Sequence, residues 1–226
     1  GKCNFSCEGF GVEYETPSGI KKCACDTYYA VDTEFKDTWT KYKTYEEVVN
    51  EVDKLISIYP YNYKIDIVIT GGEPLLYWNK QEFQKLLEHY IKAGHKVTIE
   101  TNASVNLNFE HEYQRELLFS MSVKLSNSLE PLKKRVNINT LTAVLTNTKE
   151  SYLKFVIGKD FLNDARQEIN QIISSIPKCN VYLMPLGDTA DQINKNCEDV
   201  INMAIENGFK YCDRLHIRVW DNKRGV

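Results

Sequence analysis

Apolar residues recur with two different periods along the chain, and these periods predict its helices and strands. In residues 44–60 the apolar side chains form one helical stripe. Thr44 followed three residues later by Glu47 is typical of a helix start, and Pro60 is typical of a helix stop. Residues 64–70 instead form a short run rich in β-branched side chains, which predicts a strand buried on both faces.

The same two signals alternate through most of the remaining chain. An amphipathic helix is predicted over residues 79–94, with Gly94 just beyond its last turn. Two more helices are predicted at about 160–176 and 190–207. Between residues 104 and 150 the periodicity is weak and most elements cannot be placed. Further strands are expected at residues 96–102, 119–125, 152–158, 180–185 and 214–220.

This alternation predicts an α/β fold whose sheet is mainly parallel, with right-handed crossovers. No linker rich in Ser, Pro or Gly divides the chain, so we expect a single domain over residues 1–226. Ligands of parallel sheets bind beyond the carboxyl ends of the strands. Polar or glycine-containing segments follow the predicted strands: "TGGEP" (70–74), "ETNAS" (100–104), "SVKLSNS" (122–128) and "MPLGDT" (184–189).

Charge and hydropathy narrow the classes of partner. A net charge of −3 and a pI near 5.9 give no general attraction to nucleic acid or to anionic membranes. No apolar run reaches the roughly 20 residues that span a bilayer. No signal peptide precedes the first cysteine, so we expect a cytoplasmic protein that binds neither nucleic acid nor membrane.

Cysteine placement gives the first indication of chemistry. Four of the seven cysteines lie between Cys3 and Cys25, in a glycine-containing stretch that we expect to be a loop. An odd number of cysteines in a cytoplasmic chain favours metal ligation or reactive thiols over disulfides. The residues alone leave two metals open, tetrahedral zinc or an iron–sulfur cluster. The remaining thiols, Cys179, Cys197 and Cys212, are interpreted as small buried side chains.

Several motifs carry a resemblance to a known family. The run "CNFSC" (3–7) resembles the start of the C-x3-C-x2-C loop of radical S-adenosylmethionine enzymes, with the third cysteine displaced by an insertion to Cys25 of "CDT". The order of the motifs resembles that of the 7-carboxy-7-deazaguanine synthases within that superfamily. The further matching segments are "TGGEPLL" (70–76), "TIETN" (98–102), "SMSVK" (120–124), "YLMP" (182–185), "RLHI" (214–217) and "DNKRGV" (221–226).

The resemblance implies a fold, a cofactor set and site residues. The fold would be an incomplete, open (β/α) barrel of the radical S-adenosylmethionine type. Cys3, Cys7 and Cys25 would bind a 4Fe-4S cluster, with Cys23 as the competing ligand, and Thr27 would bind Mg2+. Residues expected to contact S-adenosylmethionine are Gly72, Glu73, Asn102, Ser122, Val123 and Lys124, and those expected to contact the substrate are Thr70, His216 and Val226.

The sequence also departs from the family pattern. Lys2 replaces a glycine before the first cysteine, Ala103 replaces the glycine of "ETNG", and Val123 replaces the proline of "VSPK". Family members carry a first strand and a "QGEG"-like segment before the cluster loop, so we expect such residues upstream of Gly1.

The implied reaction converts 6-carboxy-5,6,7,8-tetrahydropterin to 7-carboxy-7-deazaguanine with loss of ammonia, in queuosine or other deazapurine biosynthesis. The resemblance also implies a homodimer and an electron donor such as flavodoxin or ferredoxin. Two alternatives remain open. One is a glycyl-radical enzyme activating protein, and the other is a non-catalytic zinc or iron–sulfur module.

Overall fold

The computed structural model describes residues 2–10, 12–23, 27–59, 63–221 and 223. Its centre is a six-stranded parallel sheet in which the strands follow one another in sequence order. Among the described residues the two edge strands do not pair with each other, so the sheet is an open, incomplete barrel as predicted. The strands are β3 (Ile67–Ile69), β4 (Val97–Thr101), β5 (Leu118–Met121), β6 (Tyr152–Ile157), β7 (Asn180–Pro185) and β8 (Lys210–Tyr211).

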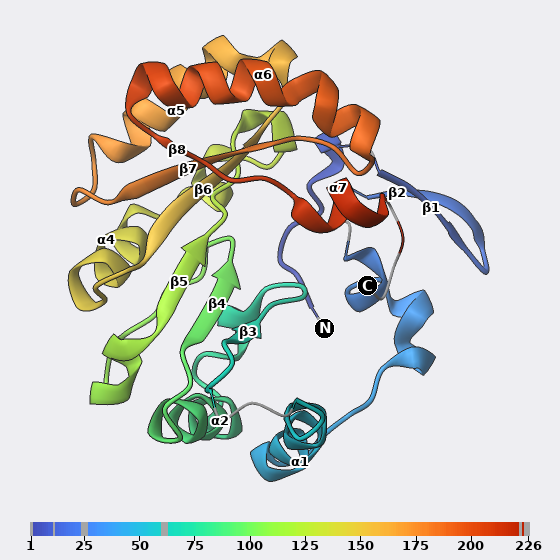
Figure 1. Ribbon diagram of the computed structural model, residues 1–226, viewed down its shortest axis with the longest axis vertical. Helices are drawn as coiled ribbons and strands as arrows, with labels where there is room; N and C mark the ends of the chain where they lie inside the picture. Colours follow the sequence, from blue (N-terminus) through green and yellow to red (C-terminus); the bar gives the residue numbers. More distant parts are fainter. Residues whose placement is uncertain (1, 11, 24–26, 60–62, 222, 224–226) are drawn as a thin grey trace.

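Helices cover the outer side of this curved sheet. Figure 1 shows α4, α5 and α6 outside the sheet, whereas the N-terminal segment and α7 lie on its open side. The predicted helices 79–94, 160–176 and 190–207 are confirmed as α2, α5 and α6. The helices are α1 (Tyr45–Ile56), α2 (Gln81–Lys92), α3 (Leu132–Arg135), α4 (Ile138–Asn147), α5 (Leu162–Ile173), α6 (Ala190–Asn207) and α7 (Leu215–Trp220), joined by short 3-10 helices.

The core lies between the sheet and the outer helices. Strand β6 shows why, because its side chains alternate between the two faces. Leu153, Phe155 and Ile157 are completely buried on the helix side, in one cluster with the apolar side chains of α4, α5 and α6. Lys154 and Val156 point to the other face and line a cavity. The apolar face therefore holds the helices, and the polar face is left for a ligand.

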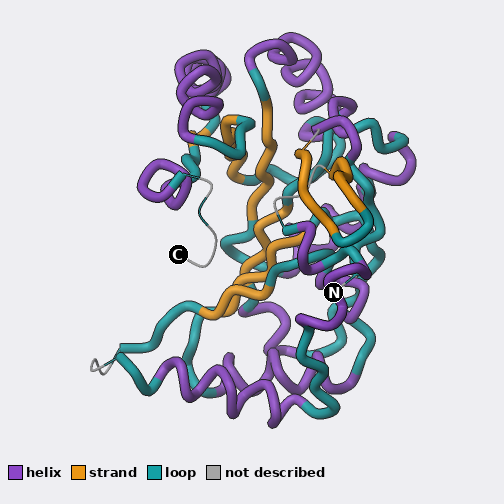
Figure 2. Tube along the Cα trace, turned by 90° about the vertical axis from the view of Figure 1, so that its right-hand side faces the viewer, coloured by secondary structure: helices purple, strands orange, loops and turns teal. Residues whose placement is uncertain are grey.

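The cysteine-rich stretch contains more regular structure than we predicted. Strands β1 (Val12–Thr16) and β2 (Gly19–Cys23) form an antiparallel hairpin that is separate from the main sheet, as Figure 2 shows. Gly19 at the turn has a positive φ of 121°, a conformation that glycine adopts without strain. The hairpin packs through a stack of Tyr14 on Tyr28, with ring centroids 3.9 Å apart. The prediction of a pure loop was therefore wrong.

Two predicted strands differ from the structure near the site. The strand predicted at 119–125 ends at Met121, because the Val123 amide turns back to the Met121 carbonyl (3.0 Å) and the chain leaves the sheet. Residues 214–220 form α7 instead of a strand, and the two-residue β8 takes the last sheet position. Alternation of Leu215, Ile217 and Val219 suggested a strand, yet only Ile217 is buried.

Other boundaries shift for local reasons. Helix α1 ends at Ile56, before Pro60 is reached, and the Glu47 carboxylate accepts from the Lys43 amide instead of completing a capping box with Thr44. Strand β3 is an edge strand with Val68 53% exposed, so it is not buried on both faces. The weakly patterned stretch 104–150 holds β5, α3 and α4 between short 3-10 helices. No helix in the described ranges is both long and apolar enough to cross a membrane.

Candidate active site

A cavity of about 820 Å³ lies on the open face of the sheet, at the carboxyl ends of its strands. The segments that follow β3, β4, β5 and β7 all line it, which confirms the predicted meeting of these polar segments. The N-terminal segment closes one side, and the region from Cys212 to α7 closes another. Thr70, Gly72, Asn102, Ser122, Lys124 and His216 line this cavity together with Cys3 and Cys7.

The two described cysteines of the predicted cluster loop open onto this same cavity. Burial raises the pKa of the Cys3 thiol, and the nearby Glu73 carboxylate adds to the rise, while the Phe5 amide and the Lys124 ammonium act against it. Cys7 is buried and has a left-handed backbone with φ of 48°. Cys25 lies outside the described residues, and within those residues no three metal-binding side chains form a group. Whether Cys7 or Cys23 is a cluster ligand stays a prediction.

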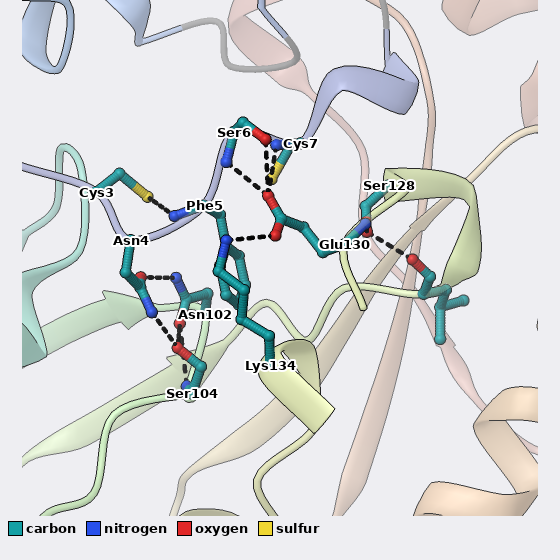
Figure 3. Close-up of polar contacts among 11 residues, drawn as sticks. Cys3, Asn4, Phe5, Ser6, Cys7, Asn102, Ser104, Ser128, Glu130 and Lys134 are labelled. Carbon is teal, nitrogen blue, oxygen red and sulfur yellow. Dashed lines mark hydrogen bonds and ion pairs between the residues drawn. The ribbon is translucent and has the colours of Figure 1, made fainter. Parts of the chain in front are cut away.

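Glu130 fixes the backbone of residues 3–7, which we call the cysteine loop (Figure 3). Its Oε1 atom accepts from the amides of Ser6 (2.6 Å) and Cys7 (2.9 Å) and from the Ser6 hydroxyl (3.1 Å). Its Oε2 atom accepts from Lys134 Nζ at 2.6 Å. Burial works to raise the pKa of Glu130, but the hydrogen bonds from Lys134, Cys7 and Ser6 outweigh it and lower the pKa to about 2. Sequence reasoning missed this residue because it lies in the weakly patterned stretch 104–150.

Asn102 ties the same loop to the end of β4 (Figure 3). The side-chain nitrogen Nδ2 of Asn102 donates to Asn4 Oδ1 at 3.0 Å, and Asn4 Nδ2 donates to Ser104 Oγ at 2.7 Å. Ser104 in turn donates through its backbone and hydroxyl to Asn102 Oδ1. Ala103, between them, has a positive φ of 55°, so this position adopts the left-handed conformation that its glycine counterpart in the family motif adopts more readily. Asn102 thus both lines the cavity and positions the cysteine loop.

The turn after β3 brings the chain's N-terminal segment against the sheet. Gly72 has φ of 63°, and a Cβ atom there would lie 2.3 Å from the Lys2 carbonyl oxygen. The Glu73 amide donates to that same oxygen at 2.8 Å. Only glycine permits this close approach between the turn and Lys2, the residue before Cys3.

The Glu73 carboxylate points into the protein, and Glu73 is not among the residues that line the cavity. It accepts from Leu75 N (2.9 Å), Thr101 Oγ1 (2.5 Å) and Asn102 N (2.7 Å), and its burial raises its pKa. The side chain therefore braces the ends of β3 and β4. The expected contact of this carboxylate with the cofactor ammonium stays a prediction, and this geometry does not provide a free carboxylate for it.

Ser122 and Lys124 lie on one side of the segment that follows β5, and this segment is not a strand. Lys124 Nζ donates to Ser122 Oγ at 3.0 Å, and both side chains line the cavity. The Lys124 carbonyl accepts from Arg135 at 3.0 Å, which fixes the backbone below the ammonium group. Val123 between them is buried and does not reach the cavity.

The far side of the cavity carries a charged pair that sequence reasoning missed. Glu100 accepts from Thr70 Oγ1 at 3.1 Å and pairs with Lys154 at 3.4 Å. Glu100 and Lys154 both lie on the polar face of their strands. The alternation of polar and apolar residues along these strands is the sequence signal that could have identified them.

The remaining predicted residues are spread over other segments. His216 reaches the cavity from α7 and not from a last strand. Thr27 is the residue before the 3-10 helix Tyr28–Ala30 and is not among the cavity-lining residues, while Val226 lies outside the described residues. His95 is buried, and its Nδ1 atom lies within hydrogen-bond distance (2.9 Å) of the Ile65 carbonyl oxygen.

Comparison with known proteins finds similarity to the same family that the sequence motifs resemble. No protein-family model matches the chain. The 7-carboxy-7-deazaguanine synthase of Rhodopirellula baltica is 29% identical over 215 residues, which cover 89% of this chain and 75% of that protein. The chain is homologous to the 7-carboxy-7-deazaguanine synthases. That of Halobacterium salinarum is 24% identical over 249 residues (96% and 88% covered), and that of Methanospirillum hungatei is 35% identical over 124 residues (54% and 47% covered).

Solved structures support the fold alone. QueE from Escherichia coli matches with a TM-score of 0.50 and 15% identity over 75% of this chain. SuiB from Streptococcus suis bound to precursor peptide SuiA matches with a TM-score of 0.53 and 13% identity over 80% of this chain. The chain spans 63% of the first structure and 45% of the second. The expected open barrel is confirmed.

Proposed function

We propose that this protein is a radical S-adenosylmethionine 7-carboxy-7-deazaguanine synthase. Its substrate would be 6-carboxy-5,6,7,8-tetrahydropterin, which loses ammonia on conversion, in queuosine or other deazapurine biosynthesis. The observation that carries the proposal is the single cavity shared by Cys3, Cys7, Gly72, Ser122 and Lys124, in a chain homologous to these synthases over most of its length.

The donor set fits an iron–sulfur cluster. Cys3 and Cys7 present two soft thiol ligands to one cavity, and Cys25 would complete the expected three. Cys23 remains the alternative to Cys7. When bound, the cluster and S-adenosylmethionine together supply one-electron chemistry and hydrogen abstraction from the substrate.

The chain's own residues then bind and orient the two organic ligands. At Gly72 the backbone is exposed to the cavity without a side chain, and Lys124 presents a cation that suits the carboxylate of S-adenosylmethionine. On the far side, Thr70 and His216 face the space where we place the pterin.

Several partners belong to the proposal as well. Thr27 would contribute one hard oxygen ligand to Mg2+ near the pterin. A flavodoxin or ferredoxin would deliver the electron, and the working form would be a homodimer in the cytoplasm. We propose no role for nucleic acid or membrane.

Anaerobic reconstitution with iron and sulfide tests the proposal. The reduced protein is mixed with S-adenosylmethionine, Mg2+ and the tetrahydropterin, and 5′-deoxyadenosine and the deazaguanine are followed by mass spectrometry. We expect Cys25→Ala to abolish both products and Cys23→Ala, the matched control, to retain them. Cofactor cleavage without pterin turnover would favour an activating enzyme that acts on a protein. Zinc in place of a cluster, or a cluster that does not cleave the cofactor, would indicate a non-catalytic module.

A further inference from the structure

Glu130 is the one acidic side chain in the described ranges that holds the cysteine loop from a distant part of the chain. It lies more than 120 residues from Ser6 and Cys7 in sequence, yet its Oε1 atom receives both of their amide protons. Its side chain is almost fully buried, and its other oxygen pairs with Lys134, which is about half exposed. A buried carboxylate that receives several charge-assisted hydrogen bonds fixes its donors strongly.

Neighbouring contacts dock the same two segments together. Gly9 packs so tightly on the 126–130 segment that a Cβ there would lie 1.9 Å from the Asn127 carbonyl oxygen. Leu129, immediately before Glu130, has a positive φ of 61°, an unfavourable conformation for leucine. Lys134 Nζ lies 5.3 Å from the centre of the Phe5 ring, between the two cysteines. Glu130 and Lys134 therefore form an ion pair that contacts residues 5–7.

This arrangement has an electrostatic consequence for anything that the cysteines bind. Backbone amides that donate to cluster sulfurs, and positive charges nearby, raise a cluster's reduction potential. Here the amides of Ser6 and Cys7 donate to Glu130, so they do not serve cluster sulfurs in this arrangement. The carboxylate itself adds a negative charge beside Cys7.

We infer that Glu130 is a positioning residue that holds Cys7 in its left-handed conformation and lowers the reduction potential of the cluster bound by this loop. Lys134 opposes the second effect, because it partly neutralises Glu130. The inference rests on the proposed function in that it assumes a cluster at Cys3 and Cys7. A low potential is the property that one-electron reduction of S-adenosylmethionine needs.

Three variants separate the two roles of Glu130. Glu130→Gln keeps an oxygen that can accept from both amides but removes the charge. Glu130→Ala removes both. Lys134→Met leaves the carboxylate and removes its counter-charge at a half-exposed position, where folding is not at risk. Glu168→Gln is the matched control, because Glu168 accepts from Ser126 and pairs with Arg135 in the same region without touching the cysteine loop.

The first measurement is the midpoint potential of each reconstituted protein, titrated with dithionite and followed by electron paramagnetic resonance. We expect Glu130→Gln to shift the potential to a more positive value, Lys134→Met to shift it to a more negative value, and Glu168→Gln to leave it unchanged. Opposite shifts cannot arise from a merely structural loss. Unchanged potentials, or shifts of the same sign, would overturn the electrostatic part of the inference.

The second measurement is amide hydrogen exchange of residues 2–10 in the metal-free proteins. Exchange of the Ser6 and Cys7 amides should be about tenfold faster in Glu130→Ala and nearly unchanged in Glu130→Gln and Glu168→Gln. Equal exchange in Glu130→Ala and wild type would overturn the positioning role. If the wild type itself takes up no cluster, the proposed function fails, and the exchange experiment still decides whether Glu130 holds the loop.

Discussion

Replacement of Gly72 by alanine tests whether the close approach at the turn after β3 holds the N-terminal segment. The new methyl group would lie 2.3 Å from the Lys2 oxygen and 2.8 Å from the Lys2 carbonyl carbon. Both are backbone atoms, so no flexible side chain can move aside. Gly71 is the natural control, since it also has a positive φ (85°) but a Cβ there would meet only the Ala30 side chain at 3.9 Å.

The expected magnitudes follow from these two environments. A left-handed backbone destabilises the folded state by about 1–2 kcal/mol when the residue is not glycine. Alanine also lowers the conformational entropy of the unfolded chain, which offsets about 0.4–1 kcal/mol of this loss. Gly71→Ala should therefore lower the free energy of unfolding by about 1 kcal/mol or less. Gly72→Ala should add the loss of the hydrogen bond from Glu73 N to Lys2 O, about 1 kcal/mol, for a total near 2 kcal/mol.

Urea unfolding of both variants gives the free energies, and amide exchange of residues 2–10 locates the damage. We expect faster exchange of the N-terminal segment in Gly72→Ala alone, together with weaker cluster incorporation. Equal destabilisation and equal exchange in the two variants would refute the reasoning. Backbone strain alone would then account for both losses of stability, and the contact with Lys2 would contribute nothing.

Three further predictions concern stability. Leu129→Gly should raise the free energy of unfolding by about 0.5 kcal/mol, because it relieves the positive φ of an exposed residue; calorimetry showing a lower melting temperature would contradict this. Burial raises the pKa of Glu73, so its contribution to stability is present below the ordinary pKa of 4.5 and is lost as pH rises through the raised value; Glu73→Gln should abolish this pH dependence in urea titrations. The Lys21 ammonium lowers the pKa of Glu34 to about 2, so the stability advantage of wild type over Lys21→Met should be present above pH 4.5 and shrink toward pH 2, and a constant difference in melting temperature would exclude the ion pair as its cause.

The order of the elements could be predicted from the sequence where local periodicity and tertiary burial agree. Helices α2, α5 and α6 each have one apolar stripe and a clear end, such as Gly94 or Gly208 in the left-handed conformation. The prediction failed for residues 214–220, because a short alternating run suits a strand and a single helical turn equally well. It also failed for the β1–β2 hairpin, where the cysteines and glycines concealed a weak strand signal.

The sequence by itself determined the chemical inventory of this protein: the cysteines of the N-terminal stretch, the glycine pair after β3, and the polar residues at the ends of parallel strands. These signals are local, so neighbouring residues are enough to read them. Only the tertiary structure decided how the inventory is used. It turned the Glu73 carboxylate inward as a brace, and it brought Glu130 across more than 120 residues to the amides of Ser6 and Cys7. Such contacts join residues far apart in sequence, and they depend on which segments the folded sheet places side by side. The hydrophobic periodicity of a sequence carries information about neighbouring residues only.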